Sequence, residues 1–243
     1  MTVQAVVAAV ETPSGGCRWH PWPVYSPDHV GAVFFDVDGT LVPGTSSSVF
    51  LAEFLGHRDE LAKAEDAYAS GARDNRQVSE LDAVGWAGVP VERISGWLDG
   101  LPLVMGIAET VAWCRRNGLV PVLATLAWSP VGSYLADRFG FHSFSGPRLE
   151  TADGRFTGRV ARHFDEHDKR DFALAQAQSL GLAPHSCAAV GDSRSDLPLF
   201  SSVGLSVAFN ASADARAAAT ATVDDDDLRS VLPVLNRLAT ASR

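Results

Sequence analysis

The chain has 243 residues, 46% of them hydrophobic, and a formal net charge of −9 at pH 7. This length suits one full α/β domain with an insert. The negative charge argues against nucleic acid as a partner, although the field inside a binding site can differ from the total charge. Three cysteines without metal-ligand spacing suit a reducing compartment. Together these features favour a cytoplasmic globular protein.

Residues 1–30 are predicted to be an N-terminal extension. The apolar stretch 3–10 is too short to span a membrane and has no basic leader, so we expect neither a signal peptide nor a membrane partner. The stretch 17–27 is rich in aromatic residues and proline, and is expected to be extended and packed on the body or on a second subunit. A ligand-binding role for Trp19, His20 or Trp22 is the weaker interpretation.

The first strong signal is the segment 31–42. An apolar run, 32–35, is followed by Asp36 and Asp38, which is typical of a buried parallel strand that presents acids at its carboxyl end. Open α/β sheets bind ligands at that edge. A spacing of two places both carboxylates on one face, and Gly39 permits a sharp turn that can direct backbone N–H groups toward an anion. Taken alone, the pattern also fits an ordinary strand-to-turn junction.

About sixty residues without a strand signal follow this segment. Helical spacing recurs over 59–70, 78–86 and 91–101. A crossover helix needs only a dozen or so residues, so 46–105 is predicted to be a small helical insert.

The α/β pattern returns near residue 107. A helix over 107–116, a strand over 119–124 that ends at Thr125, a helix over 130–139 and a short strand over 141–144 are predicted in that order. Next, Asp153 and Gly154 between two short runs predict a β-hairpin over 148–160.

A long helix is predicted over 167–180, with Lys169 in its first turn. Next comes a short apolar strand that ends at Gly191 and Asp192, with Asp196 four residues later. That spacing fits the first turn of a helix, where both acids can face one metal site. Asp36, the backbone carbonyl of Asp38, and Asp192 form a hard-oxygen set suited to Mg²⁺.

The C-terminal part is predicted to contain a strand over 205–209, a helix over 214–221 and a helix over 228–238. Four consecutive aspartates, 224–227, precede the last helix. They are interpreted as a helix cap and not as a calcium site, because they lack the spacing of loop ligands.

Four motifs, in this order, resemble the haloacid dehalogenase (HAD) superfamily of phosphate hydrolases and, within it, the phosphoserine-phosphatase-like branch. They are Asp36-Val-Asp-Gly-Thr-Leu, Thr125, Lys169 and Gly191-Asp192-Ser-Arg-Ser-Asp196. The stretch 153–159 also resembles that branch. The resemblance implies a Rossmann-like three-layer α/β core with a parallel sheet, formed by 31–45 and 106–243, and a helical cap domain inserted at 46–105.

The resemblance also implies roles. Asp36 would be the nucleophile that becomes an aspartyl-phosphate, and Asp38 the general acid and base. Thr125 would donate to the phosphate, and Lys169 would neutralise its charge. The metal group would be Asp36, Asp38 and Asp192, with Asp196 supporting the site without binding the ion directly. Phosphoryl transfer asks a protein mainly for positioning and charge neutralisation, which such a set supplies.

The substrate is where the chain departs from phosphoserine phosphatases. Thr45 stands where that group has a glutamate, and 80–86 contains no basic residue where that group has an arginine. Losing both charge partners argues against phosphoserine as the substrate.

Five residues are predicted to contact the substrate: Gly39, Thr40, Leu126, Trp128 and Arg194. Trp128 could wall the pocket and favour an apolar or ring-shaped leaving group such as a sugar. Arg194 could hold a second anionic group, pair with an aspartate of the site, or point to solvent.

The sequence therefore predicts a Mg²⁺-dependent phosphomonoesterase that acts on a small-molecule phosphate ester. A phosphotransferase or mutase using the same aspartyl-phosphate is the alternative, and a non-catalytic binding protein on this fold is less favoured. Homo-oligomerisation is left open.

Overall fold

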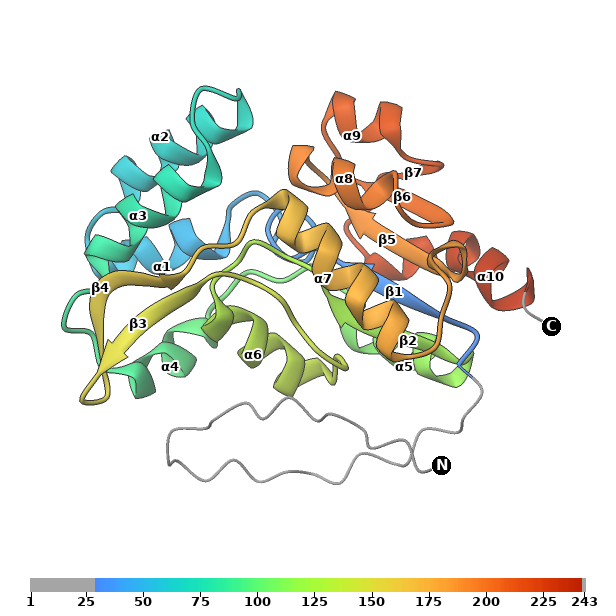
Figure 1. Cartoon of the computed structure of the whole chain (residues 1–243), viewed down its shortest axis with the longest axis horizontal. Helices are drawn as coiled ribbons and strands as arrows, with labels where there is room; N and C mark the ends of the chain where they lie inside the picture. Colours follow the sequence, from blue (N-terminus) through green and yellow to red (C-terminus); the bar gives the residue numbers. More distant parts are fainter. Residues whose placement is uncertain (1–28, 242–243) are drawn as a thin grey trace, which may run out of the picture.

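The computed structural model describes residues 29–241, so the predictions for 1–28 lie outside the described residues. Five parallel strands form one sheet in the order β2-β1-β5-β6-β7 (Figure 1). Their bounds are β1 Gly31–Phe35, β2 Leu119–Leu123, β5 Cys187–Gly191, β6 Leu205–Phe209 and β7 Ala221–Val223. Since Phe35 lies opposite Val190, β1 and β5 end side by side, and the acids that follow them emerge at one edge of the sheet.

Helices cover both faces of the sheet, as the three-layer prediction requires. On one face, Val33 and Phe35 pack in a cluster with α5, α6 and α10; on the other, Ala32 and Phe34 pack with α7, α8 and α9. Burial on both faces explains why these strands are apolar throughout instead of alternating. The helices are α5 Ile107–Arg116, α6 Ser129–Phe139, α7 Glu166–Ser179, α8 Leu197–Phe200, α9 Ala213–Ala218 and α10 Leu232–Ala241.

The insert between β1 and α5 is helical. It contains α1 Ser47–Leu55, α2 Arg58–Ala69, α3 Asn75–Gly85 and α4 Ile94–Leu98, and its first three helices enclose a small apolar cluster of their own. The predicted helix over 91–101 is wrong in extent. A single 3-10 turn, Val91–Arg93, leads into the five-residue α4, and the weak helix formers Gly96 and Gly100 followed by Pro102 limit its length.

The predicted hairpin is confirmed as β3 Arg148–Ala152 and β4 Arg155–Arg162, with Asp153 and Gly154 both at positive φ in the turn. This hairpin reaches from the sheet domain to the insert (Figure 1). Phe156 exchanges backbone hydrogen bonds with Gly88 and Val89, and its ring meets that of Trp86 edge-on at 5.0 Å. The helical insert is therefore held by a second segment as well as by its own two connections.

Three further predictions need correction. The segment 141–144 forms only one isolated bridge, Leu123 to Phe144, so it follows β2 without becoming a strand. The predicted helix over 214–221 ends early, because 221–223 pairs with β6 as β7; alanine favours helix locally, but the exposed edge of β6 provides hydrogen-bond partners. The last predicted helix begins as a 3-10 turn, Leu228–Val231, which Asp227 caps through the Arg229 N–H.

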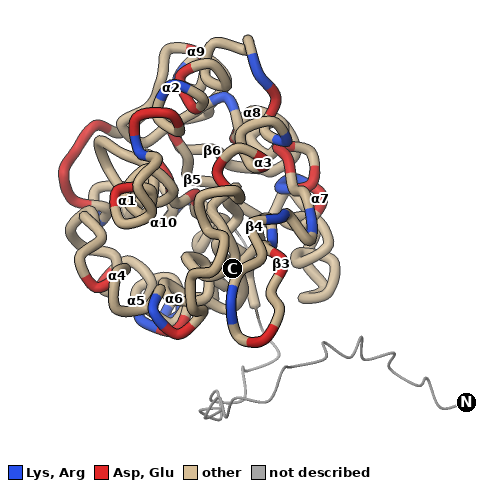
Figure 2. Tube along the Cα trace, turned by 90° about the vertical axis from the view of Figure 1, so that its left-hand side faces the viewer, with Lys and Arg blue, Asp and Glu red and all other residues tan. Residues whose placement is uncertain are grey.

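Acidic and basic residues are interspersed along α7 and the β3–β4 hairpin (Figure 2). None of the helices within 29–241 combines the length and the apolar character that a membrane crossing requires.

Candidate active site

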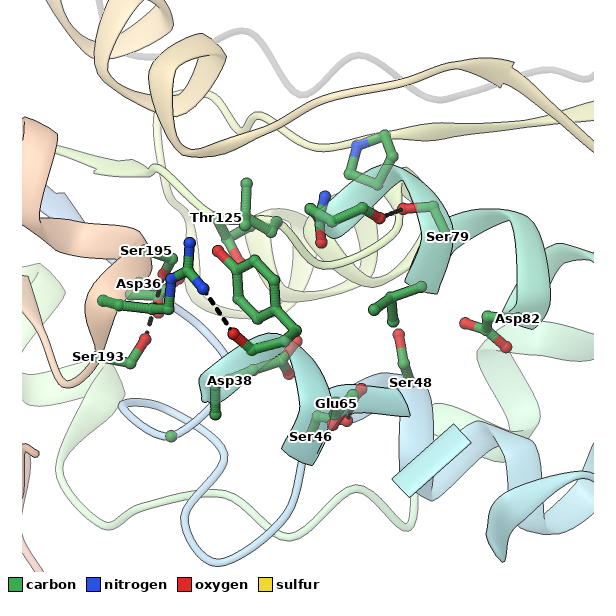
Figure 3. A pocket seen from close by; sticks show the side chains of 18 of the residues that line it. Asp36, Asp38, Ser46, Ser48, Glu65, Ser79, Asp82, Thr125, Ser193 and Ser195 are labelled. Atoms are coloured by element: carbon green, nitrogen blue, oxygen red, sulfur yellow. Dashed lines mark hydrogen bonds between the residues drawn. The ribbon is translucent and has the colours of Figure 1, made fainter. Parts of the chain in front are cut away.

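A cavity of about 320 Å³ lies where β1 and β5 end, and residues of both the sheet domain and the helical insert line it (Figure 3). Asp36, Asp38 and Asp192 line its floor, at the edge of the sheet. Ser46, Glu65 and Asp82 line its roof, which the insert forms. The site predicted at the carboxyl edge of the sheet is thus a partly open cavity between the sheet domain and the insert.

Asp36 lies at the centre of the floor and is only 4% exposed. Its Oδ1 is 2.9 Å from the Nζ of Lys169, which donates at 2.7 Å to Oδ1 of Asp196. Burial raises the pKa of Asp36 to about 7, although Lys169 opposes this. Burial alone would lower the pKa of Lys169, but Asp196 and Asp36 raise it above its usual value. The lysine is therefore a permanent buried cation between two acids.

Lys169 reaches this position because α7 begins at the right place. The side chain of Asp165 caps the helix by accepting hydrogen bonds from the backbone N–H groups of His167 and Asp168. In return, the side chain of Asp168 accepts a hydrogen bond from the backbone N–H of Asp165. This capping box fixes the first turn, from which Lys169 extends, fully buried, to Asp36.

Carboxylate oxygens of Asp36, Asp192 and Asp196 lie within 4.8 Å of one another. Burial, together with the charges of Asp36 and Asp196, raises the pKa of Asp192 to about 8. Both carboxylate oxygens of Asp196 already have hydrogen-bond partners. Its Oδ2 accepts the backbone N–H groups of Asp192 and Ser193 at 3.0 and 3.1 Å, and its Oδ1 accepts a hydrogen bond from Lys169. This acidic cluster is consistent with the metal site of a HAD enzyme. Three clustered carboxylates with one lysine leave surplus negative charge that suits a hard divalent cation.

Glycine is required beside this cluster. Gly39 has a φ of +85°, and a Cβ there would lie 2.2 Å from Oδ2 of Asp192. At Gly191 a Cβ would lie 2.2 Å from the carboxyl carbon of Asp196. Gly39 lets the two motif loops approach each other, and Gly191 lets the second loop fold back on itself so that Asp196 reaches the cluster.

Asp38 is held by the first residue of α1. Its Oδ1 accepts the backbone N–H of Ser47, the start of α1, at 2.6 Å. Burial raises the pKa of Asp38, while Ser47 opposes the rise. The proposed acid and base is thus positioned by the helix that also begins the roof.

Thr125 is completely buried at the end of β2. The Oγ1 of Thr125 accepts the N–H of Ala127 at 3.1 Å. The hydroxyl of Ser145 accepts the backbone N–H of Thr125 and donates to the Thr125 carbonyl. The hydroxyl proton of Thr125 therefore stays available for a ligand in the cavity.

The residues predicted to contact substrate divide into two groups. Gly39, Leu126 and Trp128 line the cavity. Thr40 does not; it is fully buried, and its hydroxyl donates to Asp192 at 3.2 Å. The Trp128 indole N–H donates to Oδ2 of Asp82 at 2.6 Å, which joins the floor to the roof.

Arg194 also lines the cavity, but its guanidinium already has partners on the insert and on α7. Nη1 donates to the backbone carbonyl of Tyr68 at 2.6 Å, and Nη2 lies 3.3 Å from Oε1 of Glu166. The Cζ atom of the guanidinium lies 4.6 Å from the centre of the Tyr68 ring. Arg194 therefore joins the loop after β5 to α2 of the insert.

Sequence reasoning did not select several residues of the roof. Ser46, Glu65, Asn75, Ser79 and Asp82 all line the cavity from the insert. Asp82 is the one a pattern could have indicated, because it is an acid on the face of α3 that also carries Val78. The others carry no local signal beyond Ser46 as a helix cap.

Charge neutralisation around one buried carboxylate is what phosphoryl transfer requires, so the class that this fold and site define is an α/β phosphatase. The model of the haloacid dehalogenase-like hydrolase family matches residues 33–201. The chain belongs to this family, and to its phosphoserine-phosphatase-like branch.

Curated relatives support the branch. The chain is 28% identical over 209 residues to a phosphoserine phosphatase of Albidiferax ferrireducens, which covers 82% of this chain and 87% of that protein. It is also 28% identical over 210 residues to one from a Polaromonas species, with 84% and 89% covered. Among solved structures, a phospho-aspartyl intermediate analogue of phosphoserine phosphatase matches with a TM-score of 0.76 at 23% identity, covering 84% of this chain and 97% of that one. The predicted fold and family resemblance are confirmed.

Proposed function

We propose that the chain is a Mg²⁺-dependent phosphomonoesterase that works through an aspartyl-phosphate on Asp36 and acts on a small phosphate ester other than phosphoserine. The observation that carries the proposal is the buried row Asp36, Lys169 and Asp196, because a fully buried lysine between two carboxylates provides a fixed cation at the edge of a ligand cavity. Fixed charge of this kind costs no reorganisation during the reaction.

In the proposed reaction the carboxylate of Asp36 attacks phosphorus and the bond from phosphorus to the ester oxygen breaks. Asp38 donates a proton to that oxygen, so the alcohol leaves neutral at this atom. Asp38 then takes a proton from the water that attacks the aspartyl-phosphate, which releases inorganic phosphate and restores Asp36. Lys169 and the Thr125 hydroxyl neutralise and orient the phosphate oxygens in both steps.

The acids of the floor repel a phosphate dianion, so a divalent cation is part of the proposal. When bound, Mg²⁺ would supply neutralisation of the phosphate charge, held by Asp36, Asp192 and the carbonyl of Asp38. Thr40 orients Asp192 by donating to its Oδ1.

The lining of the roof supports a substrate other than phosphoserine. Thr45 lines the cavity at the position where phosphoserine phosphatases carry a glutamate. The cavity lining within 29–241 includes one arginine, Arg194, which Tyr68 and Glu166 engage, and no lysine. A substrate carboxylate would therefore meet acids in the roof and no uncommitted cation.

The test is phosphate release from a panel of small esters, with Mg²⁺ and with a chelator, in the wild type and in Asp36→Asn. Asp137→Asn is the matched control, because Asp137 is an exposed aspartate on α6 away from the cavity. We expect Mg²⁺-dependent release in wild type and control, and a loss of at least about 10⁴-fold in Asp36→Asn.

Release that persists in Asp36→Asn would contradict the aspartyl-phosphate. Release that appears only when an acceptor alcohol is added, with the phosphate found on that alcohol, would favour the phosphotransferase alternative. Turnover of phosphoserine at a rate matching or exceeding the other esters would contradict the substrate part of the proposal.

A further inference from the structure

The roof of the cavity contains an acid without a cation. Glu65, on α2, lines the cavity and accepts a hydrogen bond from the hydroxyl of Ser46 at 2.7 Å, as Figure 3 shows. No ion pair within 29–241 involves Glu65. Burial, followed by the charge of Asp38, raises the pKa of Glu65 to about 8. A carboxyl group in this position is destabilised in its charged form until a cation approaches.

The other buried acid of the roof differs. Asp82 is 2% exposed and accepts N–H groups from His57 at 2.7 Å, Trp86 at 3.2 Å and Trp128 at 2.6 Å. Its oxygens therefore serve to join α3 to two loops. Glu65 has only a hydroxyl for a partner, so its carboxyl group has accepting capacity left for a ligand.

No cation of the floor can serve Glu65. Lys169 is fully buried against Asp36 and Asp196, and Arg194 is bonded to Tyr68 and Glu166. In the proposed reaction the floor is balanced by its own lysine and a metal ion, whereas the carboxyl group of Glu65 has no cation beside the place where the alcohol part of the ester must lie.

We infer that the leaving group is positively charged: the substrate class is the phosphate ester of an amino alcohol, whose ammonium group donates to Glu65. This inference rests on the proposed function, and it names the alcohol. Hydrolysis breaks the bond between phosphorus and the ester oxygen, gives that oxygen the proton of Asp38, and releases the amino alcohol with its ammonium unchanged. A hydrogen bond to a charged group contributes about 1.5–3 kcal/mol, which corresponds to about 10- to 100-fold in selectivity.

The inference separates three esters of similar length and different charge. These are 2-aminoethyl phosphate, 2-hydroxyethyl phosphate and phosphoglycolate, whose leaving groups are cationic, neutral and anionic. With Mg²⁺ present, we expect kcat/KM to fall in that order, with about 10- to 100-fold between the first two. A neutral hydroxyl can also bond to Glu65, but it gains no charge attraction.

Glu65→Gln keeps the shape and removes the charge, and it should reduce the ratio of kcat/KM for the aminoethyl over the hydroxyethyl ester to within about threefold of one. Glu60→Gln is the matched control: Glu60 is an exposed glutamate on the same helix, outside the cavity lining, and its removal should leave the ratio unchanged. Circular dichroism and Tm establish that both variants are folded.

The outcomes are distinct. Release from all three esters without preference for the cation, or a preference that survives in Glu65→Gln, would overturn the inference and leave the proposed phosphatase intact. Release from none would overturn the proposed function. In that case calorimetric binding of the aminoethyl and hydroxyethyl esters decides: tighter binding of the first that disappears in Glu65→Gln supports recognition of the cation, and equal binding overturns it.

Discussion

The floor and the roof of the cavity differ in whether their acids are paired with a cation. On the floor, Asp36 and Asp196 share the buried cation of Lys169, and Gly39 allows the two motif loops to approach. In the roof, Glu65 has no cation. In the proposed function the floor, with its lysine and a divalent cation, would bind the phosphate group of any ester, whereas the roof would contact the alcohol part. The proposal thus assigns chemistry and substrate choice to two separate parts of the chain.

Removing the cation of the floor should have the largest effect. In Lys169→Met, Asp36 and Asp196 lose their shared partner, so we expect kcat to fall by about 10²- to 10³-fold. The same change should lower the free energy of unfolding by about 3–5 kcal/mol, because two buried carboxylates are left unpaired. Steady-state kinetics and urea unfolding measure the two effects.

The control is Lys63→Met, which removes the only other lysine of the sequence from the exposed face of α2. Activity in Lys169→Met close to that of the control would show that the floor does not need its cation.

Trp128→Phe tests the bond that joins floor to roof. The indole N–H donated to Asp82 is lost, so a buried acceptor loses a partner at a cost of about 1–3 kcal/mol in the free energy of unfolding. We expect KM to rise by about 3- to 10-fold, with a smaller change in kcat, because the roof shifts while Asp36 keeps its lysine. Trp113→Phe, on α5 and outside the cavity lining, is the control. A fall in kcat with KM unchanged would contradict the assigned separation.

Arg194→Gln distinguishes a joint between the domains from a substrate clamp. Because its guanidinium contacts Tyr68 and Glu166, we expect KM for 2-hydroxyethyl phosphate and for phosphoglycolate to rise by the same factor, about 2- to 5-fold. Arg58→Gln, an exposed arginine of α2, is the control. A loss confined to the anionic ester would instead establish the clamp that the sequence suggested.

The smallest expected effect is on pH-dependent stability without Mg²⁺. The folded-state pKa of Glu65, about 8, lies above its ordinary value, so the folded state holds this proton more tightly than the unfolded chain. The resulting stability is fully present below the ordinary pKa and is lost as pH rises through about 8. Burial is the largest cause of this raised pKa; the charges of Asp38, Asp82 and Asp66 add to it, and the hydrogen bond from Ser46 opposes it.

The wild-type Tm should therefore fall as pH rises from about 6 to about 9. The Tm of Glu65→Gln should fall less over the same range, and each kcal/mol of stability that depends on the Glu65 proton corresponds to about 2–4 °C. Burial also raises the pKa values of Asp36 and Asp192, so part of the slope remains in the variant. Differential scanning fluorimetry across this range measures the difference. Parallel curves would show that Glu65 exchanges no proton on unfolding.

Local patterns in the sequence were sufficient for the sheet and for most of the floor. Asp36, Asp38 and Asp192 follow apolar strands directly, and parallel strands place their carboxyl ends at one edge, so these acids had to lie together if the strands were neighbours. The hairpin at 153–154 was equally local, because its turn demands residues that tolerate positive φ. Local propensity failed at 219–221, the end of the alanine-rich segment predicted as helix, where pairing of β7 with β6 decided the conformation.

The roof was decided only by the tertiary structure. Glu65 looks like an ordinary polar residue of an amphipathic helix, and nothing in its spacing tells whether it faces solvent or the cavity. Asp82 shares a helix face with Val78, but that spacing does not show what the face packs against. Arg194 and Tyr68 are far apart in the chain and meet only because the insert packs over the sheet domain, where Glu166 contacts the same guanidinium. The sequence by itself thus determined where the strand-end acids lie, because a residue that directly follows a strand must lie at the carboxyl end of that strand. Which charge remains unpaired depends on how helices dock, and docking is set by contacts between distant segments.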